Sequence, residues 1–164
     1  MNVTIVIYGS SPGTCEAIAE KIASKLGCDA LNVQNLTADM VAANQNLILG
    51  TSTWGAGELQ DDWYDGLKTL QGADLNGKTI ALFGCGDCST YSDTFVGGMG
   101  ELYNGIKDSG AKFIGAVETD GYTFDDSEAV IDGKFIGLPL DDINEDDKTD
   151  ARIEAWIASI NSEL

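Results

Sequence analysis

A hydroxyl-rich segment follows the first apolar run of the chain and could bind a phosphate. The run Val3–Tyr8 leads into Gly9-Ser10-Ser11-Pro12-Gly13-Thr14-Cys15, and apolar residues then recur at spacings of three and four. This spacing predicts a helix that begins directly after the segment. Unpaired N–H groups and partial positive charge at a helix N-terminus favour a phosphate, which the hydroxyls of Ser10, Ser11 and Thr14 would also contact. The alternative is an ordinary strand-to-helix turn with Thr14 as N-cap.

Two well-known phosphate motifs are excluded at this segment. No Lys or Arg lies in or beside it, and neither Gly-Lys-Ser/Thr nor Gly-x-Gly-x-x-Gly occurs there. The segment is therefore neither a P-loop nor a dinucleotide fingerprint. Any phosphate would be held by backbone amides and hydroxyl groups.

Two later segments each carry one large aromatic residue near glycines. Trp54 follows the apolar run 47–50, and Tyr91 follows the apolar run 79–84. Two flat aromatic side chains favour a planar ring as ligand. A ring together with a single phosphate indicates a mononucleotide, whereas the alternative for Trp54 is packing in the core.

Cysteine and histidine usage argues against metal and hydrolytic chemistry. The chain has four cysteines and no histidine, so the commonest general base and the commonest zinc ligand are missing. Cys85 and Cys88 have C-x-x-C spacing, but a zinc site would need two more ligands, and a redox pair usually lies at a helix start. We interpret the pair as thiols that line a loop, and we expect no metal.

Alternating strands and helices predict an α/β fold. Strands are expected at 3–8, 30–33, 47–50, 79–84 and 112–117, and helices from Cys15 to Leu26 with Gly27 as C-cap, and at 37–43, 61–70, 93–109 and 146–161. This alternation predicts a three-layer sandwich around a five-stranded parallel, doubly wound sheet. The segments after strands one, three and four then share one edge, where such sheets bind ligands. We attribute the glycines within 93–109 to close packing on the sheet.

Composition indicates one acidic domain spanning 1–164. The chain has 27 acidic and nine basic residues and a formal charge of −18, which disfavours nucleic acid and anionic membranes. This charge favours a partner with a basic face, although it also confers solubility. No apolar run approaches the ~20 residues of a membrane span. We expect a cytoplasmic monomer.

Several longer motifs identify a family resemblance that covers essentially the whole chain. They are Thr51-Ser52-Thr53-Trp54-Gly55-Ala56-Gly57-Glu58, Leu82-Phe83-Gly84-Cys85-Gly86-Asp87 with Tyr91 and Asp93, Gly121-Tyr122-Thr123-Phe124, the stretch 133–141, Asn144, and Thr149-Asp150-Ala151-Arg152-Ile153 with Trp156. With the hydroxyl-rich first segment, these residues resemble the long-chain flavodoxins. The stretch 118–133 resembles the insertion that interrupts the fifth strand in that subfamily.

The resemblance implies the strand order 2-1-3-4-5, noncovalently bound FMN, and low-potential one-electron transport between redox enzymes rather than an enzymatic activity. It implies partners such as a flavodoxin reductase and electron-accepting oxidoreductases that present basic faces. The phosphate would lie on residues 10–15 and the ring between Trp54 and Tyr91. The implied cofactor-binding residues are Ser10, Ser11, Pro12, Gly13, Thr14, Cys15, Thr51, Ser52, Thr53, Trp54, Gly55, Ala56, Gly57, Cys85, Gly86, Asp87, Tyr91 and Asp93.

Two residues depart from the family pattern, because Pro12 and Cys15 stand where the family usually has threonine. Pro12 lacks a hydroxyl and a backbone donor, and Cys15 offers only a weak S–H donor. Weaker FMN binding or compensation by Ser11 would follow.

Two other functions compete with electron transport. An FMN-dependent NAD(P)H:quinone-type reductase is the alternative, although the sequence contains no nicotinamide motif. A phosphoacceptor receiver domain would need an acidic pair after strand one, an Asp closing strand three and a Lys closing strand five. These positions hold Gly9-Ser10, Gly50-Thr51 and Val117-Glu118, so we reject it.

Overall fold

Helices and strands alternate in the computed structural model, which describes residues 3–9, 14–54, 58–59, 62–85, 96–120, 122, 124, 127–141 and 146–164. The helices are α1 (Thr14–Leu26), α2 (Ala38–Ala43), α3 (Asp62–Gln71), α4 (Gly97–Ile106) and α5 (Asp146–Ile160). The main sheet contains β1 (Thr4–Gly9), β2 (Asp29–Asn32), β3 (Asn46–Trp54), β4 (Glu58–Leu59), β5 (Thr79–Cys85), β6 (Lys112–Ile114) and β10 (Leu138–Leu140). A small antiparallel sheet contains β7 (Val117–Glu118), β8 (Val130–Ile131) and β9 (Lys134–Phe135).

The main sheet confirms the predicted parallel topology. Its strands follow the order β10-β5-β3-β1-β2, with β6 also paired to β5 and β4 paired antiparallel to β3. β6 pairs with the first half of β5 and β10 with its last three residues, so together they occupy the position of one edge strand. Counted in this way, the order is 2-1-3-4-5, and the fifth strand is interrupted as expected.

The predicted strand 112–117 is too long, because the chain turns at Gly115. The strand ends at Ile114, and Gly115 has a φ of +85°, a conformation that glycine tolerates and other residues rarely adopt. The indole Nε1 of Trp156 in α5 donates to the Gly115 carbonyl at 2.8 Å. Val117 instead pairs with Phe135 in the small sheet.

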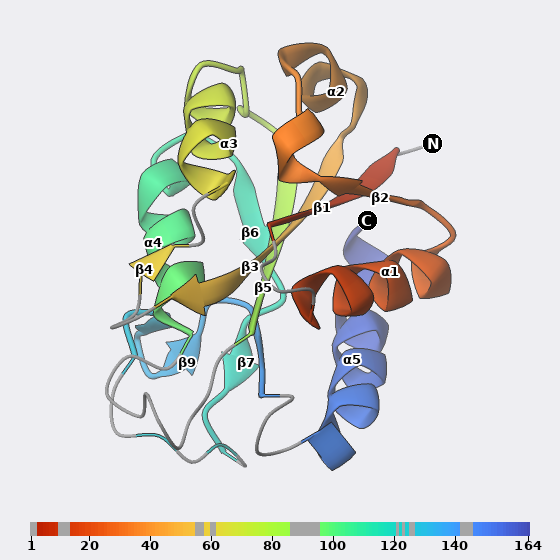
Figure 1. The fold of residues 1–164 in the computed structure, drawn as a ribbon, viewed down its shortest axis with the longest axis vertical. Coiled ribbons are helices and arrows are strands. Elements are labelled where there is room, and N and C mark those ends of the chain that lie inside the picture. Colours follow the sequence, from red (N-terminus) through yellow and green to blue (C-terminus); the bar gives the residue numbers. More distant parts are fainter. Residues whose placement is uncertain are drawn as a thin grey trace.

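Helices cover both faces of the sheet, as Figure 1 shows. Val6, Ile48 and Phe83 pack in one core cluster with side chains of α1 and α5. The adjacent residues of the same strands, Ile7, Leu49 and Leu82, belong to a second cluster with side chains of α3 and α4. Successive strand residues point to opposite faces, so the central strands are apolar on both sides. The predicted three-layer arrangement is confirmed.

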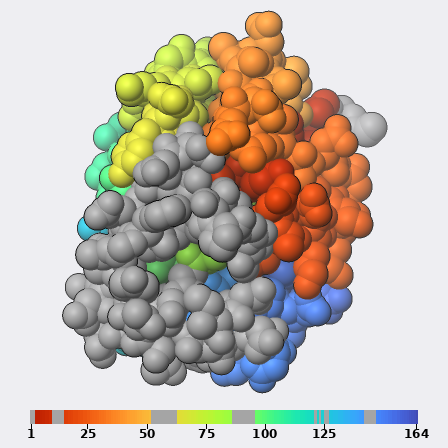
Figure 2. Space-filling view, in the orientation of Figure 1, coloured from red at the N-terminus to blue at the C-terminus, as the bar shows by residue number. Residues whose placement is uncertain are grey.

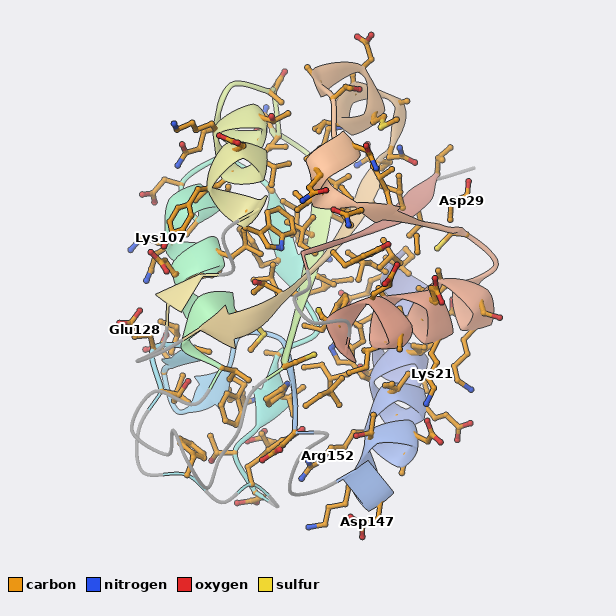
Figure 3. The ribbon with its side chains drawn as sticks, in the orientation of Figure 1. Lys21, Asp29, Lys107, Glu128, Asp147 and Arg152 are labelled. Atoms are coloured by element: carbon orange, nitrogen blue, oxygen red, sulfur yellow. The ribbon has the colours of Figure 1, made fainter. Side chains whose placement is uncertain are left out.

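Helices α1 and α5 are neighbours on the same face of the sheet. Figure 2 shows α1 in orange-red next to α5 in blue. Lys21 projects from α1 (Figure 3), and its Nζ lies 2.9 Å from Oδ1 of Asp150 in α5. One turn further along α1, Lys25 lies 3.1 Å from Glu154. The first helix ends as predicted, because Gly27 has a φ of +71° and the Cys28 N–H donates to the Ala23 carbonyl at 3.0 Å.

The glycines of α4 explain the close approach of other segments, although not in the way we expected. A Cβ at Gly100 would lie 2.6 Å from the backbone of Glu128 in the insertion. A Cβ at Gly105 would lie 2.7 Å from the Leu67 side chain in α3. At these two positions the close neighbours are the insertion and α3 rather than the sheet. The helix also ends at Ile106, short of the predicted Ser109.

Candidate functional site

The three predicted ligand-binding segments begin at adjacent strand ends. Gly9 at the end of β1 pairs with Thr51 of β3, and Thr51 in turn pairs with Gly84 of β5. Ser52 pairs with Cys85, the last residue of β5. The segments that continue from these strands therefore start within two strand spacings of one another, about 10 Å. This edge is the place at which doubly wound sheets bind ligands.

The structure describes only part of the predicted residue set. Thr14 begins α1, and Ser52, Thr53 and Trp54 end β3, so their backbones are placed. Side chains are described for Cys15, Thr51 and Cys85. Outside the described residues lie Ser10, Ser11, Pro12, Gly13, Gly55, Ala56, Gly57, Gly86, Asp87, Tyr91 and Asp93.

Cys15 and Cys85 meet beneath the edge of the sheet. Cys15 is completely buried, and Cys85 is 7% exposed in the same core cluster. A hydrogen bond with the Cys85 side chain, followed by burial, raises the pKa of the Cys15 thiol well above its usual value. The Cys15 side chain is therefore engaged inside the core. Its contribution to a phosphate would come from its backbone N–H.

The N-terminus of helix α1 lies close to the end of β1, where its backbone N–H groups could bind a phosphate. The helix has 13 residues and begins at Thr14, so four residues separate it from Gly9, the last residue of β1. Its first N–H groups have no partner within the helix, and the helix dipole is positive at this end. This arrangement fits the phosphate of a mononucleotide.

Sequence reasoning missed the contact between Tyr8 and Glu16. The Tyr8 hydroxyl donates to Oε1 of Glu16 at 3.0 Å, which links the end of β1 to the first turn of α1. Burial, followed by the hydrogen bond to Glu16, raises the pKa of the Tyr8 hydroxyl. The sequence signal was a tyrosine at a strand end and an acid in the first helical turn on either side of the phosphate segment.

Trp63 and Phe83 also support this edge and were not predicted to do so. The Trp63 side chain is buried, and its Nε1 donates to the Gly50 carbonyl at 2.7 Å. A Cβ at Gly50 would lie 2.0 Å from the Phe83 ring, so the ring crosses β3 where glycine leaves room. Both aromatic residues hold β3 just before the predicted ring-binding segment.

The comparison with protein families identifies the family of the chain. A family described as Flavodoxin matches residues 6–156, which include all three strand ends. The chain belongs to the flavodoxin family. Flavodoxin 1 of Azotobacter vinelandii is 47% identical over 97% of this chain and 95% of its own length. The flavodoxin of Helicobacter pylori is 42% identical over 94% of each chain.

Solved flavodoxin structures agree with the observed topology. The Fusobacterium nucleatum flavodoxin, whose structure contains flavin mononucleotide, superposes with a TM-score of 0.93 at 33% identity. The match covers 100% of this chain and 99% of the other. In the parts of the chain that the structure describes, no helix combines the length and apolar character needed to span a membrane.

Proposed function

We propose that the protein is a low-potential one-electron carrier that uses noncovalently bound FMN. The observation that carries this proposal is the convergence of β1, β3 and β5 at the N-terminus of α1 in a chain of the flavodoxin family. Bound FMN supplies the one-electron chemistry. Flavodoxins are electron-transfer proteins rather than enzymes, and the comparisons give no support to a quinone reductase.

The protein holds the phosphate through residues 10–15, without a basic side chain. Backbone amides at the start of α1 and the hydroxyls of Ser10, Ser11 and Thr14 are the donors. The N-terminus of α1 supports this assignment, because a helix N-terminus presents partial positive charge to an anion. Cys15 adds a backbone donor, since its thiol is engaged with Cys85.

The flavin ring lies between Trp54 and Tyr91 in this proposal. Residues 51–57 and 85–87 with Asp93 complete its surroundings. The placement of the β3 and β5 ends supports the assignment, because both segments start from paired strands. Aromatic side chains bind the ring by stacking and exclude water from its faces.

The surrounding charge tunes the cofactor. With a formal charge of −18, the protein opposes any reduction step that adds negative charge to the ring. This field lowers the potential of that step. The same charge repels nucleic acid and attracts the basic faces of redox partners.

We also propose a single domain that contains the insertion 118–133, a monomeric state and a cytoplasmic location. Among the described residues, Cys15, Cys28 and Cys85 form no disulfide, which supports a reducing compartment. The partners would be a flavodoxin reductase and electron-accepting oxidoreductases with basic faces.

Anaerobic, stepwise reduction of the FMN-loaded protein tests the proposed function. Visible spectra should resolve two one-electron steps at separate potentials. The isolated protein should oxidise NADPH only when a reductase is added. A single two-electron step, together with rapid NADPH oxidation by the protein alone, would instead support the FMN-dependent reductase.

A further inference from the structure

Tyr8 and Glu16 lie on either side of the segment assigned to the phosphate. Tyr8 is the next-to-last residue of β1, and Glu16 is the third residue of α1. The 3.0 Å hydrogen bond from the Tyr8 hydroxyl to Glu16 Oε1 therefore spans residues 9–15. Because it joins a strand to a helix, this bond constrains both ends of the segment.

The Tyr8 ring is a rigid anchor for this bond. It is 7% exposed and packs in one core cluster with Cys15 and Ile18 of α1. A tyrosine has only two side-chain torsions, so a packed ring places its hydroxyl with little residual freedom. A tyrosine hydroxyl is protonated at neutral pH, and burial raises its pKa further here, so it remains a donor.

The position of Glu16 would otherwise be unfavourable for phosphate binding. A glutamate at the third helical position can reach back to a free N–H at the start of its own helix. The helix dipole attracts a carboxylate to the same place. Those amides are the donors assigned to the phosphate, and a carboxylate among them would both occupy a donor and repel the dianion.

We infer that Tyr8 is a positioning residue for the FMN phosphate, because it holds the Glu16 carboxylate away from the amides at the start of α1. This inference rests on the proposed function, specifically on the phosphate lying at residues 10–15. Tyr8 itself needs no contact with the cofactor. It acts by giving Glu16 another donor.

Three variants separate this role from simple packing. Tyr8→Phe removes the donor and keeps the ring. Glu16→Gln removes the charge and keeps a side-chain oxygen that accepts from Tyr8. The double variant Tyr8→Phe/Glu16→Gln releases the side chain at position 16 without its charge.

The measurement is the Kd of the apoprotein for FMN and for riboflavin, which has the same ring without the phosphate. Quenching of flavin fluorescence reports both. Tyr8→Phe should weaken FMN binding about five- to tenfold, the effect of one hydrogen bond, with riboflavin binding unchanged. Glu16→Gln and the double variant should bind FMN within about twofold of the wild type, since neither carries a competing charge.

The outcomes distinguish failure of this inference from failure of the proposed phosphate site. If the wild type prefers FMN to riboflavin but Tyr8→Phe weakens both equally or neither, Tyr8 has no phosphate-directed role. If the double variant stays as weak as Tyr8→Phe, the Glu16 charge is not the cause. A wild type without preference for FMN would overturn the phosphate placement itself. Urea unfolding of each apoprotein tests whether a lost affinity reflects lost folding.

Discussion

At the scale of single residues, Gly50 shows how the interior of the sheet shapes its ligand-binding edge. Gly50 lies in β3 directly beside Phe83 of β5. The space that it leaves allows the Phe83 ring to cross β3 and meet Trp156 of α5 edge-on, with ring centroids 6.4 Å apart. The Gly50 carbonyl meanwhile accepts from Trp63 on the other face. Gly50 thus contributes to contacts with α5 on one face of the sheet and with α3 on the other.

We expect Gly50→Ala to destabilise the protein by about 2–3 kcal/mol, the upper part of the usual range for overpacking a core. The added Cβ would lie 2.0–2.4 Å from three atoms of the Phe83 ring, so the ring or β3 must shift. Urea unfolding of the apoprotein measures this change.

Gly72→Ala is the matched control. Its Cβ would come no closer than 3.5 Å to a neighbouring atom, and its φ is not positive. This substitution should be neutral or stabilise slightly, by about 0.4–1 kcal/mol. Equal stability of the two variants would show that the Phe83 ring does not limit position 50.

At the scale of elements, ion pairs and aromatic contacts connect the outer helices and the insertion. α1 and α5 share the pairs Lys21–Asp150 and Lys25–Glu154. At the insertion, the Arg152 guanidinium of α5 lies over the Tyr122 ring at 4.0 Å. The Tyr122 hydroxyl donates to the Pro139 carbonyl at 2.8 Å. These contacts position α5 against both α1 and the insertion.

Asp150→Asn should reduce stability at neutral pH and have no effect in strong acid. The hydrogen bond and charge of Lys21 lower the pKa of Asp150 in the folded protein. A lowered folded pKa stabilises the fold above the unfolded pKa, about 3.9, and this contribution disappears as the pH falls through the folded value. Urea midpoints measured at several pH values should therefore become equal for the variant and the wild type once the pH is below the folded pKa of Asp150.

Salt supplies a second check on this pair. The Lys21 and Asp150 side chains are 50% and 76% exposed, so salt should screen their attraction. The difference between variant and wild type at neutral pH should shrink at about 1 M salt. Asp108→Asn makes the same charge change on an exposed residue outside this helix pair. If Asp108→Asn lowered stability as much as Asp150→Asn does, net charge rather than the Lys21–Asp150 pair would be responsible.

At the scale of the whole molecule, negative charge dominates and is concentrated in the C-terminal part of the chain. Between Glu118 and Glu154 the sequence contains 13 acidic and three basic residues. Some of these acids are paired within the fold, as Glu118 is with Lys134 at 3.1 Å. Figure 3 shows Glu128, Asp147 and Asp29, which begins β2, on three separate parts of the molecule.

Charge reversal at Glu128 and Asp147 should slow association with a basic redox partner. We expect the association rate at low salt to fall about tenfold and its salt dependence to become shallower, because steering depends on the local field. Stopped-flow electron transfer at several ionic strengths measures both effects. Asp29→Lys, outside the acidic stretch 118–154, is the control and should change the rate less. Equal effects at all three positions would indicate that net charge alone governs encounter.

Local sequence patterns by themselves determined the fold class and the segments that carry the candidate site. Apolar runs bounded by glycine and hydroxyl residues predicted the central strands, and the spacing from Cys15 to Leu26 predicted α1. The predicted ends of β1 and β5 lie within one residue of the observed ends, because a fully apolar run is a strong local signal. β3 instead continues four residues beyond its predicted end at Gly50, to Trp54. The parallel alternation then required the three segments to share one edge.

The tertiary structure alone decided the contacts between residues distant in the chain. Gly50 and Phe83 are 33 positions apart, and Gly115 and Trp156 are 41 positions apart, so no local pattern links them. The edge strand β6 ends at Ile114, and the indole of Trp156 in α5 bonds to the carbonyl of the next residue, Gly115. β4 is only two residues long and depends on pairing with β3. Periodicity reports which face of an element is buried, whereas packing between elements selects the partner that buries it.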